Sequence, residues 1–245
     1  MNEVALKLTE SAVFAAEEVR ASGNHLAAHR QTREVATFPL ESFSTLPKGE
    51  KQLFLMAARI HVSSLISEAG KQWSVQKTIR RLKQARQVIV NVYENENVKK
   101  AAEIINTDTR DNVYEFSTEM ARDKAEYTLH LAAVSGNNVF VEDALERINQ
   151  AIETAKEPSA RTLLEFRRDQ ILYREDPDKV NSKSLKRSFR RALKAAANNK
   201  QWERTSTVSS RYAIESLKKK NVPEVVQGLL GVVISGTKDK RTWAV

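Results

Sequence analysis

The chain has 245 residues, of which 41% are hydrophobic and 29% charged, and its formal net charge is +9 at pH 7. It contains no cysteine, which excludes a disulfide framework, thiolate metal ligands and a cysteine nucleophile. Its 7 glycines and 5 prolines leave little material for the turns of an all-β fold, and the long runs of Ala, Leu, Glu, Lys and Arg favour helices.

The N-terminal region predicts an amphipathic helix followed by a long loop. Apolar residues recur at helical spacing from Val4 to Val19, and Gly23 is expected to close this helix. A short basic segment then leads to an irregular loop near residues 34–49, which two prolines interrupt. Because the loop contains several Phe and Leu residues, we expect it to lie against the helices.

Three helical segments are predicted in the next part of the chain. Residues 51–69 are apolar on more than one side, which is typical of a helix buried between neighbours, and Gly70 is expected to end it. A helix over residues 74–93 and a weaker one over residues 97–105 follow. Residues 106–108, Asn-Thr-Asp, are expected to lead as cap residues into a long helix.

The clearest pattern is a helical hairpin between Lys124 and Ala155. Its first helix belongs to the long helix, whose apolar face is predicted to begin at Val113. Gly136 supplies a positive φ for the turn, and so short a turn makes the two helices antiparallel neighbours. The second helix has one apolar stripe, which consists of Val141, Ala144, Leu145, Ile148, Ile152 and Ala155.

The C-terminal part predicts further helices over residues 159–174, 182–198 and 202–220, and a short apolar helix around residues 225–233. We find no alternating strand of useful length and no linker rich in Gly or Pro. The sequence therefore predicts an all-α fold, with residues 1–245 forming a single domain of about nine or ten helices packed as antiparallel hairpins.

Positive charge is concentrated in a basic C-terminal subregion, residues 179–220. This subregion contains 13 Lys or Arg residues and two acids, a net charge of +11, so the other 203 residues together carry −2. Such asymmetry is the electrostatic footprint of a surface that meets nucleic acid, anionic lipid or an acidic protein.

Within the basic subregion, the helix over residues 182–198 carries its charge on one face. Leu185, Phe189 and Ala192 recur on the opposite face. The charged face, here called the basic ridge, consists of Lys183, Lys186, Arg187, Arg190, Arg191 and Lys194. The ridge could contact the phosphates of RNA or DNA without sequence specificity, or an acidic protein partner; a merely solvated helix face is the alternative.

Motifs for chemistry are absent from the sequence. His25 and His29 have the i, i+4 spacing of two metal ligands, but no third ligand is indicated and Leu26 replaces the glutamate of the zincin motif. There is no Gly-flanked nucleophile elbow and no phosphate-binding Gly-rich loop. We therefore expect no catalytic residues, no cofactor and no metal, and predict that the protein is not an enzyme.

The hairpin from Tyr127 to Pro158 resembles a tetratricopeptide repeat. Ala132 on its first helix, and Ala144, Ile148 and Ala151 on its second, have the spacing of that family's small and large packing residues. Pro158 lies about two residues later than the family's proline. The resemblance implies a short solenoid with a concave surface that binds proteins, and no catalysis.

Together these patterns predict a binding or scaffold protein that engages a protein partner. Sequence-nonspecific nucleic-acid binding or packaging through the basic ridge is the alternative function. The N-terminus has glutamates and no apolar block typical of a signal peptide, so we expect a soluble, cytoplasmic protein that does not bind a membrane.

Overall fold

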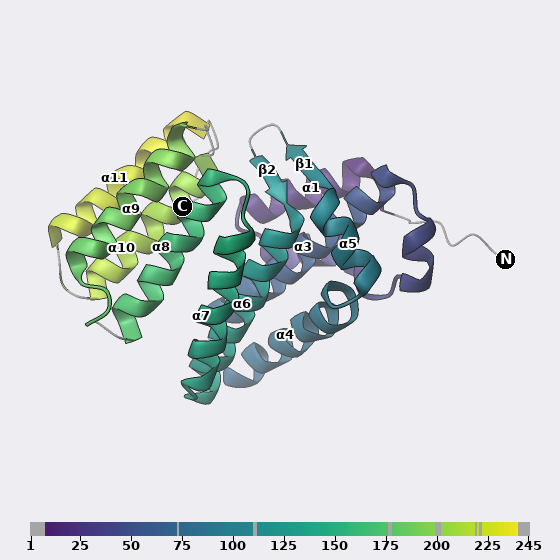
Figure 1. The fold of residues 1–245 in the computed structure, drawn as a ribbon, viewed down its shortest axis with the longest axis horizontal. Coiled ribbons are helices and arrows are strands. Elements are labelled where there is room, and N and C mark those ends of the chain that lie inside the picture. The colour runs from purple at the N-terminus through teal and green to yellow at the C-terminus, as the bar shows by residue number, and fades with distance from the viewer. Residues whose placement is uncertain are drawn as a thin grey trace. The chain divides into compact units, whose positions relative to one another are not determined.

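The fold is all-α, as predicted, and contains one short two-stranded sheet (Figure 1). The computed structural model describes residues 8–72, 74–109, 112–175, 178–198, 202–218, 220 and 222–239. Residues 4–7, where the first helix was predicted to begin, lie outside this description. None of the described helices is both long enough and apolar enough to cross a membrane.

The contacts within the chain fall into two compact units. The first unit comprises Met1–Thr107 and Tyr114–Gln150, and the second comprises Asp108–Val113 and Ala151–Val245. Each unit has its own cluster of buried apolar side chains. That the whole chain forms one domain stays a prediction.

The first unit is built around α3 (Lys48–Lys71), which is buried on most sides. It contacts α1 (Glu10–Ala21), α2 (His25–Gln31), α4 (Val75–Val88) and α6 (Phe116–Ser135). The predicted burial of this helix is confirmed. Gly70 does not end it, since the helix continues to Lys71. The glycine instead allows a close approach to α6, because a Cβ at position 70 would lie only 2.9 Å from the His130 imidazole.

The loop near residues 34–49 packs against α3, as predicted. It forms two short 3₁₀-helices, η1 (Arg33–Ala36) and η2 (Leu40–Thr45). Phe43 is fully buried, and its ring centroid and that of Phe38 each lie 5.2 Å from the ring centroid of Phe54 on α3. The loop's aromatic side chains therefore belong to the core of the first unit.

A β-hairpin stands where cap residues were predicted. The helix α5 (Glu96–Ile104) is followed by β1 (Asn106–Thr109) and β2 (Asn112–Glu115), and α6 begins only at Phe116. The assignment of Val113 to the long helix was therefore wrong. Asn and Asp favour turns as strongly as helix caps, and the Thr, Val and Tyr residues beside them favour strands.

A turn of π-helix separates α4 from α5. The segment η3 (Ile89–Tyr93) continues the predicted helix with wider turns, and it buries Ile89, Val92 and Tyr93. Insertions of this kind often lie at functional sites. Here the turn directs the Tyr93 hydroxyl to Asp123 on α6, with 3.0 Å between the two oxygens.

The predicted turn between α6 and the next helix is confirmed. Gly136 has φ 66°, and the next helix, α7 (Val139–Thr154), begins three residues later. The Val139 N–H donates to Asn137 Oδ1 over 3.0 Å, which satisfies one free donor at the helix start. Ala144, Ile148 and Ala155 of the predicted apolar stripe are fully buried.

Four helices form the second unit: α8 (Pro158–Glu175), α9 (Ser182–Asn198), α10 (Trp202–Lys218) and α11 (Val222–Asp239). Each packs against the next along the chain, and α10 also contacts α8. At the centre the Phe189 ring lies parallel to the Tyr212 ring, with 4.0 Å between centroids, and 6.0 Å from the Phe166 ring. The last helix is longer than the predicted residues 225–233.

Candidate binding site on the last three helices

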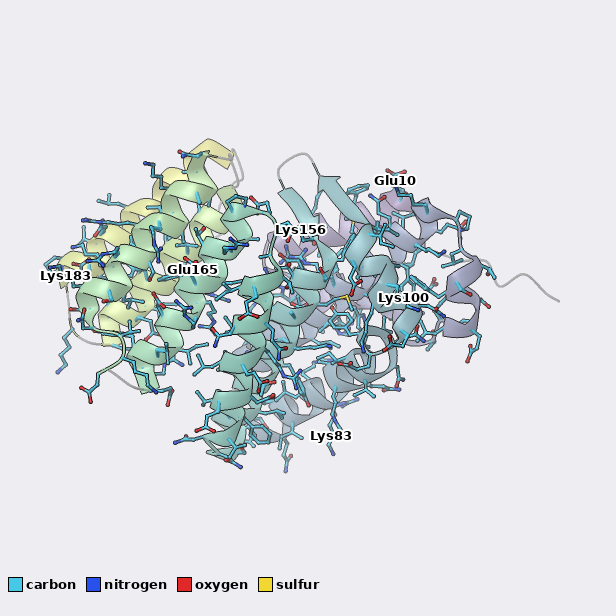
Figure 2. The ribbon with its side chains drawn as sticks, in the orientation of Figure 1. Glu10, Lys83, Lys100, Lys156, Glu165 and Lys183 are labelled. Atoms are coloured by element: carbon cyan, nitrogen blue, oxygen red, sulfur yellow. The ribbon has the colours of Figure 1, made fainter. Side chains whose placement is uncertain are left out.

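The structure places the basic ridge on one exposed face of α9. Leu185, Phe189 and Ala192 lie on the opposite face, which is buried in the second unit. Five ridge residues are exposed and Lys186 is partly buried. Figure 2 shows Lys183 at the ridge, with Glu165 on the neighbouring helix α8. The helical period thus separates charge from core as the sequence predicted, although this placement does not test whether the ridge binds anything.

Two of the six ridge residues are engaged within the second unit. Lys186 Nζ donates to Glu224 Oε1 on α11, and Arg191 Nη2 lies 3.4 Å from Glu165 Oε2 on α8. The other four, Lys183, Arg187, Arg190 and Lys194, make no ion pair with any residue that the structure describes. A block of positive charge therefore faces solvent on α9.

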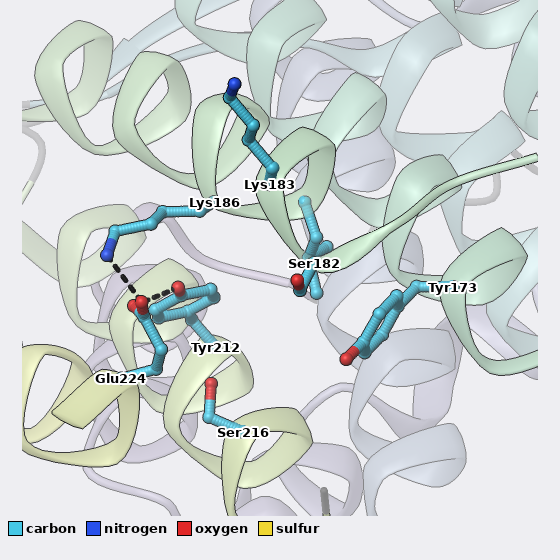
Figure 3. Close-up of a pocket in the computed structure, with 8 residues that line it drawn as sticks. Tyr173, Ser182, Lys183, Lys186, Tyr212, Ser216 and Glu224 are labelled. Carbon is cyan, nitrogen blue, oxygen red and sulfur yellow. Dashed lines mark hydrogen bonds and ion pairs between the residues drawn. The ribbon is translucent and has the colours of Figure 1, made fainter. Parts of the chain in front are cut away.

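A small cleft lies beside the first turn of α9 (Figure 3). Its volume is about 230 Å³, and all four helices of the unit contribute to it, through Tyr173, Ser182, Lys183, Lys186, Tyr212 and Glu224. That is less space than the ~300–1,000 Å³ of typical small-molecule sites. Since the polar groups are those of Ser, Tyr, Lys and Glu, the cleft offers hydrogen bonds but no set of metal ligands.

The carboxylate of Glu224 is the electrostatic centre of this cleft. It accepts hydrogen bonds from Lys186 Nζ and from the Tyr212 hydroxyl. Burial alone would raise the pKa of Glu224, but these two hydrogen bonds outweigh burial and lower it. Burial, together with the bond to Glu224, raises the pKa of Tyr212. At neutral pH the carboxylate is ionised and the phenol neutral, so this arrangement holds α9, α10 and α11 together and is not poised for proton transfer.

A second glutamate joins α8 to α10 in the same manner. Glu215 is buried, and its Oε1 accepts from Arg174, from Lys218 at 3.2 Å and from Gln170 at 3.3 Å. Burial would raise the pKa of Glu215, but the partners, above all Arg174, lower it. Glu215 and Glu224, the acids of α10 and α11 whose side chains the structure describes, are therefore both used inside the unit.

The hairpin of α10 and α11 exposes large apolar side chains that the sequence analysis did not identify as a site. They are Ile214 and Leu217 on α10 and Val226, Leu229 and Leu230 on α11, here called the apolar strip. The available signal was the apolar character of α11 all around its circumference, which exceeds what one buried face requires.

The first unit contains a buried ionic cluster, which the sequence pattern did not predict either. Arg59 on α3 lies 3.0 Å from Glu17 on α1 and 3.4 Å from Glu119 on α6. Next to it, burial raises the pKa of Asp123 to about 6, against the opposing effect of Arg122 and Arg59. These residues pack three helices and η3 together. Apolar periodicity cannot reveal such a cluster, because it gives no partner for a buried charge.

The histidines form no metal site among the described residues. His29 packs edge-on against His61 of α3 with 5.6 Å between ring centroids, and His61 Nδ1 lies 3.3 Å from the Thr32 hydroxyl. Burial lowers the pKa of both rings, that of His61 to about 4. In the part of the chain that the structure covers, no three His, Asp or Glu side chains come together to hold an ion.

No protein family, curated protein or solved structure matches this chain. The resemblance of the Tyr127 to Pro158 hairpin to a tetratricopeptide repeat therefore stays a prediction.

Proposed function

We propose that this protein is a non-catalytic binding protein that engages a protein partner through its second unit. The apolar strip carries the proposal. Its five side chains are 49–65% exposed, although they lie on two helices that pack closely together. Fully burying a large apolar side chain is worth about 1.5–3 kcal/mol, so covering five half-exposed ones would contribute roughly 5 kcal/mol to binding.

Two observations favour binding without catalysis. The cleft beside α9 is small, and its one carboxylate is held by Lys186 and Tyr212. The buried carboxylate with a raised pKa, Asp123, is hydrogen-bonded to Tyr93 inside the helical core of the first unit. Neither arrangement combines a nucleophile, a base and room for a substrate.

Affinity enrichment with the immobilised full chain, followed by quantitative mass spectrometry, tests the proposal. The Leu229→Glu variant places a charge in the apolar strip. Ile104→Glu is the matched control, because Ile104 is 78% exposed on α5 of the first unit. We expect at least one protein to be enriched by the original chain and by Ile104→Glu but lost with Leu229→Glu. Equal recovery with both variants would contradict the proposal.

Nucleic-acid binding through the basic ridge is a second candidate, because four ridge residues face solvent without an ion pair to a described residue. Fluorescence anisotropy with labelled single-stranded and duplex nucleic acid, at two salt concentrations, tests it. Charge reversal of Arg187, Arg190 and Lys194 should weaken binding strongly and, for single strands, reduce the slope of log affinity against log salt by about 2. Absence of binding at low salt would retire this candidate.

A further inference from the structure

The apolar strip lies on the side of the α10–α11 hairpin that α9 does not cover. The two helices approach closely, since a Cβ at Gly228 would lie 2.7 Å from Ala213 Cβ and one at Gly231 would clash with the Ser209 side chain. On α9, Phe189 stacks on Tyr212 and Lys186 binds Glu224, which fixes the covered side. At 100° per residue, Ile214, Leu217 and Leu229 then fall on the opposite side of the hairpin.

The spacing of the strip matches the way one helix receives another. Ile214 and Leu217 are three residues apart, and Val226, Leu229 and Leu230 follow the i, i+3, i+4 rule. Two such rows on adjoining helices form an exposed apolar face against which a third amphipathic helix can place its apolar anchors. An extended peptide would instead need a free strand edge, which the hairpin of two helices does not have.

The charge around the strip specifies the partner further. The α10–α11 hairpin itself, residues 202–239, contains six Lys or Arg and four acids, a net charge of +2. Two of those acids, Glu215 and Glu224, are engaged inside the unit, whereas Lys218 and Lys220 are exposed next to the strip. A partner helix with acidic residues beside its apolar face would therefore be attracted.

Taken with the proposed function, on which this inference rests, the geometry points to an acidic amphipathic helix of a partner protein as the occupant of the apolar strip. A second copy of the chain fits less well, because its strip would bring the same exposed Lys218 and Lys220 and no exposed carboxylate that the structure describes. An anionic membrane also fits less well. Helices that lie in a membrane surface carry Lys and Arg on their polar face, whereas residues 222–232 of α11 contain neither.

The test uses the full chain and a labelled synthetic peptide of about 14 residues, with Leu at helical spacing on one face and Glu elsewhere. Anisotropy titrations compare the original chain with Leu229→Glu and with the Ile104→Glu control. The peptide should bind the original chain and the control alike, and Leu229→Glu should bind it about tenfold more weakly. A peptide with Lys in place of every Glu should also bind about tenfold more weakly.

Equal affinity for the acidic and basic peptides, or an unchanged affinity in Leu229→Glu, would overturn the inference. Sedimentation with phosphatidylserine vesicles adds a third arm. If Leu229→Glu abolishes vesicle binding and the acidic peptide does not bind, the strip is a membrane contact instead. The enrichment experiment does not use the peptide, so a partner lost with Leu229→Glu, despite no peptide binding, would leave the proposed function standing and reject only the acidic helix.

Discussion

Acidification should change the free energy of unfolding in opposite directions through two buried groups of the first unit. Substituting either group should expose the pH dependence that the other one causes. Burial lowers the pKa of His61 from 6.5 to about 4, and burial raises the pKa of Asp123 from 3.8 to about 6. The histidine faces His29 and Thr32, while the carboxyl faces Tyr93, Arg59, Arg122 and Glu119. In each case the folded and unfolded states bind different numbers of protons between the two pKa values, so stability depends on pH there.

Whether acidification raises or lowers the free energy of unfolding depends on which state, folded or unfolded, binds the proton more tightly. The unfolded chain binds the His61 proton more tightly than the folded chain. The contribution of His61 to the free energy of unfolding is therefore present above pH 6.5 and is lost as the pH falls towards 4. The folded chain binds the Asp123 proton more tightly than the unfolded chain. The contribution of Asp123 to the free energy of unfolding is therefore present below pH 3.8 and is lost as the pH rises through 6. At about 1.4 kcal/mol per pKa unit, each effect amounts to about 3 kcal/mol.

Because the two effects nearly cancel in the original chain, the variants are informative. Between about pH 7 and pH 4, Asp123→Asn should lose about 3 kcal/mol more stability than the original chain, and His61→Gln should gain about 3 kcal/mol relative to it. Urea unfolding followed by circular dichroism at several pH values measures both. If the two variants change with pH in the same direction, or parallel the original chain, the assignment of these buried protonation states is wrong.

Substitutions at four further positions address packing and polar contacts, and thermal or urea unfolding measures each. Gly228→Ala should cost about 1–3 kcal/mol because the new Cβ would lie 2.8 Å from backbone nitrogen on α10, whereas Gly49→Ala, with open space around it in the first turn of α3, should be neutral or stabilise by up to about 1 kcal/mol. Arg59→Met should cost about 3–5 kcal/mol, since it leaves the carboxylates of the first unit's cluster without their central cation; a loss below that of a surface substitution would refute this role. Tyr212→Phe should cost about 1 kcal/mol by removing one hydrogen bond, and Tyr212→Ala about 3–5 kcal/mol because the stacked ring is also lost.

Periodicity predicted most of the helices because each has a buried stripe that repeats at 3.6 residues. The helix α9 is the clearest case, since its apolar and basic residues separate by position alone. The prediction failed at residues 106–115, where the same Asn and Asp residues suit a cap or a turn and only pairing with a second segment decides.

The candidate surfaces also differ in whether the sequence alone could predict them. The basic ridge follows from the sequence of one helix, so it could be predicted residue by residue. The apolar strip could not, because it depends on which side of α11 packs against α10, and that is set by Gly228 and Gly231 approaching the other helix. The Arg59 cluster likewise depends on three helices that are distant in sequence. Long-range pairing, rather than local pattern, determines both.

Two buried or partly buried glutamates, Glu215 and Glu224, connect the stability of the second unit to its surface. Glu215 and Glu224 each accept hydrogen bonds from a lysine or arginine of another helix, and Glu224 thereby neutralises one ridge residue, Lys186. Using these acids inside the unit stabilises the bundle and removes them from the surface. Among the residues of α9, α10 and α11 whose side chains the structure describes, there are exposed apolar side chains and exposed cations but no exposed carboxylate. A surface of this composition favours an acidic partner with apolar anchors, because such a partner loses few hydrogen bonds to water at the strip while its charges remain solvated at the rim.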